Sequence, residues 1–382
     1  MRTINLCVLV SCGFFGVACE NETPKPAPAE APKAAAAPQK EEPKKAEAPK
    51  PLEGEALAKV YVDCWGLWSE AKWDKFGACY SESAISSFPD SGQPTLNGRD
   101  AIIANFKGLR SAFPDTRGAP EIVLMNGRTV ATVGFQTGTN SGPMKNPDGS
   151  SMPATNKKIG QHIFHSVTFD DKNQAVSETF MQDLGNMMAQ LGVSKMPARA
   201  LVTEPMAGSP KIVIAKNDET EKANVATVQK VWDAFSKEDV KSVEAAMADD
   251  VLESDQADPA DHKGKKAVMD NCKMFLGAMS DLKQDCSTWG AGDYVVSQCK
   301  VSAVNDGNMG KMFKKTGKTV NMSIAEVTKL TGGKISEIYR FYNGMAMAQQ
   351  LGLLPPPAAA GEAKAMPAAP AKGAVKPASM KK

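Results

Sequence analysis

The stretch GNMMAQLG, residues 185–192, has a near twin in GMAMAQQLG, residues 344–352. Both stretches are rich in methionine and other helix-favouring residues, and both follow a run of strand-forming residues. The segments that precede the two twins also occur in the same order along the chain. This internal self-similarity predicts two copies of one domain.

Each copy is expected to begin with helices and to continue with antiparallel strands. Apolar residues recur at helical spacing, as Val228 and Trp232 illustrate, and a further helix is expected after Gly98 and after Gly264. Asn126-Gly127 lies between two β-rich runs and predicts a tight hairpin. Helices followed by a meander of strands indicate an α+β fold. The expected helical segments are residues 54–84, 96–116, 224–251 and 262–282, and the expected hairpins are residues 120–139, 157–183, 282–304 and 318–344.

The first 19 residues have the composition of a secretory signal of the lipoprotein type. One Arg precedes an apolar run that ends at Cys19, whose thiol would carry the lipid. Residues 20–53 are nearly all Pro, Ala, Lys and Glu, and residues 356–382 repeat this composition, so we expect a disordered tether and a disordered tail. The chain is therefore expected to be a membrane-anchored lipoprotein of the cell envelope that faces the periplasm or the exterior, with a plainly secreted protein as the alternative.

Between these ends, residues 54–194 are expected to form the first domain, residues 195–218 a linker, and residues 219–355 the second domain. The basic residues are scattered and the net charge is +2, which argues against a nucleic-acid partner. Cysteine spacing matches no zinc pattern, only three His are present and no nucleotide-binding Gly loop occurs, so neither a metal nor a cofactor is expected.

Export to an oxidising compartment would favour disulfides. Cys64 is expected to pair with Cys79, and one further disulfide is expected among Cys272, Cys286 and Cys299.

The ordered motifs resemble those of the SnoaL-like polyketide cyclase or ester cyclase group, within the nuclear-transport-factor-2-like superfamily. The resemblance rests on a Gly-led helix that ends in FPD (residues 113–115), on GTNSG (residues 138–142) and on the two QLG endings. It covers residues 54–193 and 219–354. It implies two cone-shaped domains, each with a strongly curved, mostly antiparallel sheet of about six strands wrapped on about three helices, and an apolar pocket at the open end.

In enzymes of this group, an Asp at the end of the last strand acts as a general base on a carbon next to a carbonyl. The resemblance places Asp183 at this position in the first copy and Asn343 in the second, and an amide cannot take up the proton. Glu337 precedes Asn343 by six positions, as is usual in the family, but Glu178 precedes Asp183 by only five. Either a β-bulge restores the direction of Asp183, or it points away from the pocket and caps the next helix.

His162 and His165 lie at opposite parity in one expected strand, so only one of them can face the pocket. The more apolar face carries His165, which is a candidate donor to a ligand carbonyl or, alternatively, a packing residue. The residues expected to line the pockets are Trp65, Gln161, Ile163 and Met187 in the first copy and Tyr339 and Asn343 in the second.

Three functions remain open. The favoured one is the binding of small apolar or amphipathic molecules in the cone pocket of a tethered, exported protein. The alternatives are an ester cyclase or isomerase that uses Asp183 as the base, and an interaction module in which sheets pair between domains or in a homodimer. Export weighs against polyketide cyclisation, because its reactive intermediates are made in the cytoplasm.

Overall fold

The computed structural model describes residues 50–145, 150–310 and 312–355, which belong to one compact unit. The predicted signal with Cys19, nearly all of the predicted tether and the tail after residue 355 lie outside the described residues. The first copy contains α1 (Gly54–Ser69), α2 (Trp73–Gly77), β1 (Tyr80–Ser87), β2 (Leu96–Asn97), α3 (Arg99–Ala112), β3 (Arg117–Asn126), β4 (Thr129–Thr139), β5 (Met144–Lys145), β6 (Ser151–Met152), β7 (Lys158–Phe169), β8 (Ala175–Met181), α4 (Leu184–Gln190) and β9 (Lys211–Ile214). The second copy contains α5 (Glu219–Ser236), α6 (Val240–Ala246), β10 (Met247–Asp255), β11 (His262–Lys263), α7 (Lys265–Leu276), β12 (Ser280–Ala291), β13 (Tyr294–Val304), β14 (Thr319–Thr331), β15 (Lys334–Phe341) and α8 (Gly344–Leu351).

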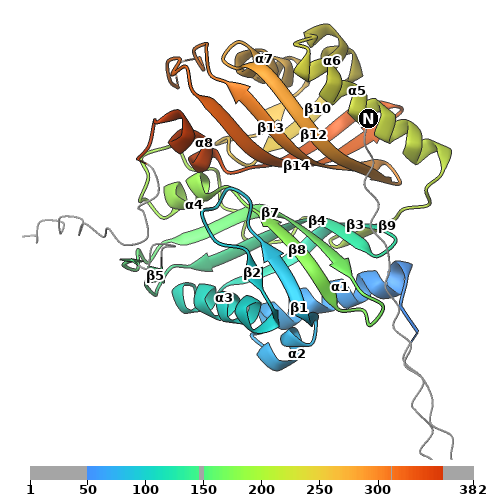
Figure 1. Cartoon of the computed structure of the whole chain (residues 1–382), viewed down its shortest axis with the longest axis vertical. Coiled ribbons are helices and arrows are strands. Elements are labelled where there is room, and N and C mark those ends of the chain that lie inside the picture. The colour runs from blue at the N-terminus through green and yellow to red at the C-terminus, as the bar shows by residue number, and fades with distance from the viewer. Residues whose placement is uncertain (1–49, 146–149, 311, 356–382) are drawn as a thin grey trace, which may run out of the picture. The chain divides into compact units, whose positions relative to one another are not determined.

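The two copies have the same sheet topology, which confirms the α+β prediction. The first sheet has the strand order β2-β1-β8-β7-β4-β3-β9, and the second has the order β11-β10-β15-β14-β13-β12. Most neighbours are antiparallel, but β1 pairs with β8 and β10 pairs with β15 in parallel. Figure 1 shows each sheet curved, with α1, α2 and α3 on one face of the first sheet and α5, α6 and α7 on one face of the second.

The segment predicted as a linker contains β9, which extends the first sheet by pairing in parallel with β3. A buried side chain also holds this segment in place. Arg199 donates to the backbone oxygens of Asp255 and Asp258 and to Ser254 Oγ in the second copy.

One loop is built twice from the same hydrogen bonds. Asn140, fully buried, donates to the carbonyl oxygens of Ala112 and Gly142 and accepts from Thr155 N–H. Asn305, also fully buried, makes the matching bonds to Ala278, Gly307 and Thr316. The GTNSG motif of the first copy therefore has a structural counterpart in the second, which supports the duplication.

The prediction that each copy opens with one continuous helix was wrong, because residues 80–87 and 247–255 are strands. The first helix of each copy is also interrupted, since Ala71 and Glu238 have positive φ, a conformation that ends a helix. Strand β1 pairs with β8, nearly a hundred residues away. Local periodicity cannot report such distant pairing, so tertiary contacts override it.

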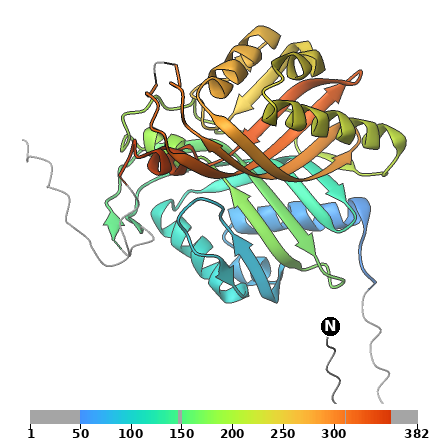
Figure 2. The same ribbon diagram turned by 45° about the horizontal axis from the view of Figure 1, so that its top comes forward.

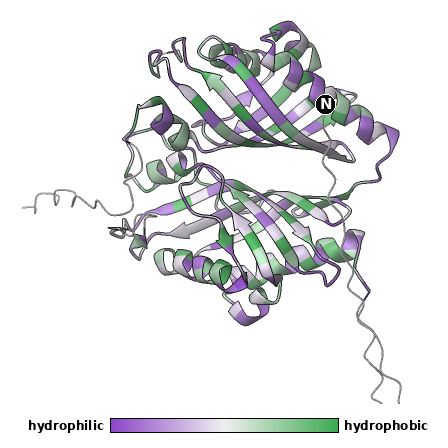
Figure 3. Ribbon diagram, viewed as in Figure 1, coloured by the Kyte–Doolittle hydropathy of each residue, from purple (hydrophilic) through white to green (hydrophobic). Residues whose placement is uncertain are grey.

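The hydrophobic cores lie within each copy and between the two sheets. Figure 3 shows strands on which hydrophobic and hydrophilic residues alternate, as expected when both faces have different surroundings. Residues of both sheets form one buried cluster, in which the rings of Phe164 and Phe341 lie 6.0 Å apart. The outer faces of the two sheets are thus packed against each other within one chain.

Two disulfides join Cys64 to Cys79 and Cys286 to Cys299, and Cys272 is unpaired, which confirms the predicted pairing. The twin segments form α4 and α8, as predicted, and the two views in Figures 1 and 2 agree that these helices lie side by side. In the described part of the chain, no helix is both long and apolar enough to span a membrane.

Candidate functional site

The interior of the first domain is nearly filled by aromatic rings. Tyr61, Trp65 and Trp68 project from α1 toward the sheet and are buried. Gly118 and Gly134 allow this approach, since a Cβ at either position would meet the Trp65 ring at 3.2 or 3.3 Å. The cavity that remains has a volume of about 50 Å³. That space accommodates about one water molecule rather than an organic ligand.

His165 faces this interior, as its strand parity predicts. Its Nδ1 lies 3.0 Å from the hydroxyl of Tyr61, and its Nε2 lies 3.0 Å from Glu178 Oε2. Tyr80 donates to the same Glu178 oxygen over 2.8 Å. Because the protein itself occupies both ring nitrogens, His165 is a packed member of a polar network and has no nitrogen left for a ligand carbonyl. His162 lies on the opposite face, 3.1 Å from Glu121.

Glu178 is held ionised by this network. Burial acts to raise the pKa of Glu178, but the hydrogen bond and charge of His165, with the hydroxyl of Tyr80 among further donors, outweigh burial and leave the pKa below its ordinary value. The carboxylate is therefore a stable acceptor and a poor proton carrier at neutral pH.

Most of the pocket residues predicted in the first copy do not border this cavity. Trp65 lines it. Ile163 is fully buried in the core, Gln161 donates to Gln182, and Met187 packs in a cluster with Phe113. The prediction assumed an open cone, whereas aromatic rings occupy the space.

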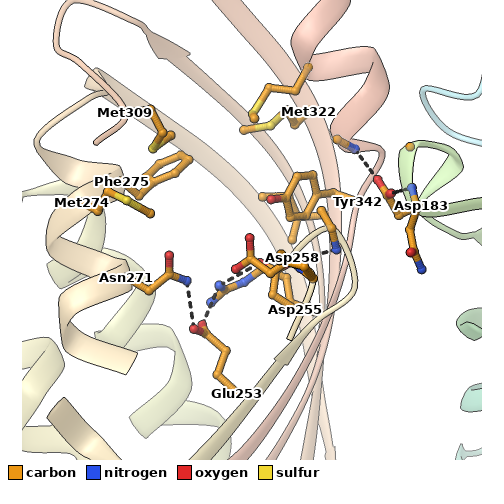
Figure 4. Close-up of a pocket in the computed structure, with 18 of the residues that line it drawn as sticks. Asp183, Glu253, Asp255, Asp258, Asn271, Met274, Phe275, Met309, Met322 and Tyr342 are labelled. Carbon is orange, nitrogen blue, oxygen red and sulfur yellow. Dashed lines mark hydrogen bonds and ion pairs between the residues drawn. The ribbon is translucent and has the colours of Figure 1, made fainter. Parts of the chain in front are cut away.

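The second domain, in contrast, encloses a cavity of about 1260 Å³. Helix α5 contributes Val228, Val231, Trp232 and Phe235 to the wall of this cavity. Figure 4 shows Met274, Phe275 and Met309 on one wall and Met322 on another. Methionine side chains are flexible and polarisable, so such walls can adapt to ligands of different shape.

A charged cluster lies among these apolar walls. Arg340 donates through Nε to Glu326 (2.5 Å) and through Nη1 to Glu253 (2.6 Å), and Nη1 lies 3.4 Å from Asp255. The three carboxylate side chains are at most 7 % exposed. Asn271 on α7 donates to the second oxygen of Glu253 over 3.1 Å, as Figure 4 shows.

Burial raises the pKa of Asp255, and Arg340 offsets that effect only in part, while Asp258 and Glu253 raise it further. Burial also raises the pKa of Glu326, although the charge of Arg340 acts to lower it. One guanidinium among three buried carboxylates thus leaves an excess of acid, which favours the protonated forms of Asp255 and Glu326.

Sequence reasoning missed this cluster. In the strand pairing, Arg340 lies opposite Glu326, and the same positions of the first copy hold Phe180 and His165. A signal was present, since Glu253 and Asp255 occupy alternate positions of one strand and so share a face. Their partners come from β14 and β15, and sequence spacing does not reveal that convergence.

Asp183 borders the second domain's cavity rather than the interior of its own cone. Its side chain caps α4 by accepting from Asn186 N–H, and its second oxygen accepts from Gly344 N–H over 2.7 Å at the start of α8. Figure 4 shows Asp183 apart from the charged cluster. Burial raises the pKa of Asp183 to about 6, although both backbone donors favour the ionised form.

The helix-cap alternative for Asp183 is therefore the observed one, and no bulge is needed. Glu178 faces the interior of the first copy, whereas Glu337 faces outward and pairs with Lys329. When the two copies are aligned, Glu178 and Glu337 are offset by one strand position. An offset of one residue places a side chain on the opposite face of a strand, so the two Glu residues are not equivalent. The spacing difference thus says nothing about where Asp183 points.

Two pocket residues predicted in the second copy lie elsewhere. Tyr339 belongs to the cluster between the sheets, since its parity directs it outward. Asn343 caps α8 by accepting from Ala346 N–H and donates to the backbone oxygen of Asp90 in the first copy. Neither residue borders the large cavity.

A family model described as SnoaL-like polyketide cyclase matches residues 55–191 and again residues 226–351. None of the curated proteins compared with the chain matches it. Solved structures that match one copy include a putative SnoaL-like polyketide cyclase from Jannaschia sp. CCS1, at 17 % identity over 37 % of this chain and 99 % of that chain, with a TM-score of 0.34. An LEH-like epoxide hydrolase from M. tuberculosis matches at 14 % identity over 35 % of this chain and 92 % of that chain (TM-score 0.30). A putative polyketide cyclase from Streptomyces antibioticus matches at 15 % identity over 36 % of this chain and 98 % of that chain (TM-score 0.31).

Proposed function

We propose that this protein, which belongs to the SnoaL-like polyketide cyclase family, binds a small apolar or amphipathic molecule in the cavity of its second domain. The observation that carries the proposal is the cavity itself, with a volume of about 1260 Å³ inside largely apolar walls. Ligand cavities in proteins typically measure about 300–1,000 Å³. The space thus suits a ligand of drug size or larger.

The charged cluster suggests how such a ligand is oriented. Arg340, Glu253 and Asp255 line the cavity, and apolar side chains surround them. An amphipathic molecule can place its polar end on this cluster and its apolar part against the methionine-rich walls, so that neither part is left unsatisfied. The first domain, with its aromatic filling, serves as a scaffold in this proposal.

The test combines ligand identification with a cavity-filling variant. Organic extracts of the purified chain, analysed by mass spectrometry, are expected to contain a co-purified lipophilic molecule. Ile324 lines the cavity, so Ile324→Trp should weaken binding of the fluorescent probe N-phenyl-naphthylamine at least about tenfold, which corresponds to 1.4 kcal/mol.

A matched control adds the same ring outside the cavity. Ile85 is 44 % exposed, and Ile85→Trp should leave probe affinity unchanged. Equal affinity of the wild-type chain and Ile324→Trp, with empty extracts, would contradict the proposal.

A second candidate function is acid–base chemistry by Asp183 on an enolisable carbonyl compound. It is favoured by the position of Asp183 on the cavity wall and by its pKa of about 6, which suits a general base near neutral pH. It is disfavoured because backbone N–H groups occupy both carboxylate oxygens. In this reading Asp183→Asn lowers turnover of a ketone or ester by about 10²-fold or more. Unchanged turnover would exclude it.

We also propose that the chain is exported and anchored through a lipid on Cys19. The support is the sequence of residues 1–53. Metabolic labelling with a radioactive fatty acid should mark the wild-type chain, and Cys19→Ala should abolish the label and move the protein to the soluble fraction. A label that persists in the variant would rule out this anchor.

Pairing of sheets, in our proposal, joins the two domains of one chain rather than two chains. The outer faces of the two sheets are already buried against each other, in a cluster that includes Phe164 and Phe341. Sedimentation of the purified Cys19→Ala chain should therefore give a monomer, whereas a stable dimer would favour the interaction-module alternative.

A further inference from the structure

Exposed apolar side chains gather at the border of the large cavity. In the described part of the chain, large hydrophobic residues that remain exposed are few, and half of them line this cavity: Val193 (50 % exposed), Met196 (55 %), Met312 (61 %) and Leu353 (40 %). Exposed apolar residues scattered singly need no explanation, but a group around one opening indicates an interaction site. We call these four residues the rim.

The rim comes from three segments that are far apart in sequence. Val193 and Met196 follow α4, Leu353 follows α8, and Met312 lies in the loop between β13 and β14. The rim is therefore built from both copies, and the side-by-side placement of α4 and α8 brings its parts together.

Positive charge accompanies the rim. Residues 184–203, 307–325 and 344–354, which supply it, contain no Asp or Glu. Lys195, between Val193 and Met196 in sequence, is exposed and also lines the cavity. The ammonium groups of Lys157 and Lys318 lie against Gly192 and Gly352, next to Val193 and Leu353. Lys314 and Lys315 are exposed beside Phe313, which lines the cavity.

An apolar patch edged by lysines is the pattern of a surface that lies on an anionic membrane. Apolar side chains enter the boundary between headgroups and acyl chains, while Lys side chains attract anionic lipid headgroups. A protein or peptide partner would also bury the apolar patch, but the exposed lysines of these segments, which contain no acid, favour an extended anionic surface.

We propose that the rim docks on the surface of a membrane that contains anionic lipids, so that an amphipathic ligand passes between the bilayer and the cavity without crossing water. This inference rests on the proposed binding function for its purpose, but the docking itself is independent of it. Lipid transfer through water is costly because the apolar chain is exposed, and direct contact of cavity and bilayer avoids that exposure.

The test follows backbone hydrogen exchange of the full chain by mass spectrometry, with and without vesicles. Vesicles of phosphatidylcholine with phosphatidylglycerol should slow exchange around Met196 and Met312, and vesicles of phosphatidylcholine alone should do so less. Exchange around Ile85, an exposed apolar residue outside the cavity, should not change. This local readout separates docking of the rim from attachment by a lipid anchor.

The variant Met196→Glu/Met312→Glu places carboxylates on the rim and should abolish the slowing, whereas Ile85→Glu/Ile212→Glu, which adds the same charges elsewhere, should retain it. Exchange around the rim that is unaffected by vesicles, or equally slowed in both double variants, would overturn the proposal. Probe binding by the wild-type chain in solution, measured without vesicles, tests the cavity separately from the docking. If the wild-type chain does not bind the probe, the binding function alone is refuted. If vesicles do not slow exchange around Met196 and Met312, the docking alone is refuted.

Discussion

Among the described residues, Arg340 is the one basic side chain that forms an ion pair with the carboxylates of Glu253, Asp255 and Glu326, and Arg340→Met removes it. The side chain of Arg340 is 25 % exposed, and those of the carboxylates are 4 %, 5 % and 7 % exposed. Removing one partner of a buried ion pair costs about 3–5 kcal/mol, because the other charge stays buried without compensation. Since protonation relieves part of that cost, we expect Arg340→Met to lower the free energy of unfolding by about 3 kcal/mol at pH 8.

The size of this loss should depend on pH in a defined direction. Burial raises the pKa of Asp255 and of Glu326 in the folded state above their values in the unfolded chain. Such groups keep their protons longer in the folded state, so folded stability decreases as pH rises through the folded pKa. Without Arg340 these pKa values rise further. The loss caused by the variant is therefore largest where the wild-type acids are ionised and shrinks as pH falls toward 5.

Urea denaturation followed by circular dichroism at pH 8 and pH 5 measures both effects. Lys329→Met is a matched control on the same two strands, because its partner Glu337 lies on the outer face and the pair is partly exposed. An exposed pair contributes at most about 1 kcal/mol. A loss for Arg340→Met below about 1 kcal/mol at pH 8, or a loss of equal size at both pH values, would refute the reasoning.

Three further outcomes are expected. Asn140→Ala and Asn305→Ala each leave buried carbonyl and N–H groups unpaired, so each variant should lower the free energy of unfolding by about 1–3 kcal/mol in thermal denaturation. Clearly different losses in the two variants would argue against the equivalence of the two loops. Replacing both Cys64 and Cys79 by Ala removes the disulfide that closes a loop with a sequence separation of 15, and should lower the free energy of unfolding by about 3 kcal/mol in the same measurement. A reducing agent cannot lower stability through this disulfide in the variant, because the bond is absent. Because the pKa of Asp183 in the folded state is about 6, above its ordinary 3.8, the contribution of Asp183 to stability should fall by at most about 3 kcal/mol as pH rises from about 4 to 6. Asp183→Asn should remove this contribution, and a pH dependence of stability that is the same in the variant and the wild-type chain, measured by urea titration, would contradict the burial argument.

Strand parity and the repeated closing segments predicted local features correctly. His165 faces the interior and His162 the opposite side, because side chains alternate along a strand whatever the strand packs against. Asp183 caps the helix that follows it, which was one of the alternatives that the sequence left open. Asn343 was expected to line the pocket, but it caps the next helix in the same way, because the first N–H groups of a helix lack internal acceptors. The closing helices could likewise be located before their packing was known.

Predictions that depended on distant contacts were less successful. The residues of β1 were expected to be helical. They form a strand because they pair with β8, which lies far along the chain and which local sequence does not reveal. A pocket was expected in each copy, although Trp65 and Trp68 fill that space in the first. Cavity volume depends on how side chains from several helices and strands pack together, and the composition of the sequence does not reveal that packing.

The sequence by itself determined that the chain repeats one α+β domain, that a methionine-rich helix follows the last strand of each hairpin, and that His162 and His165 face opposite sides of one strand, because these features follow from periodicity and self-similarity. Only the tertiary structure decided that the second copy holds the open cavity, that Arg340 gathers Glu253 and Asp255 there, and that Asp183 borders the cavity of the other copy. The physical reason is that volume, desolvation and charge pairing are set by atoms brought together from distant parts of the chain.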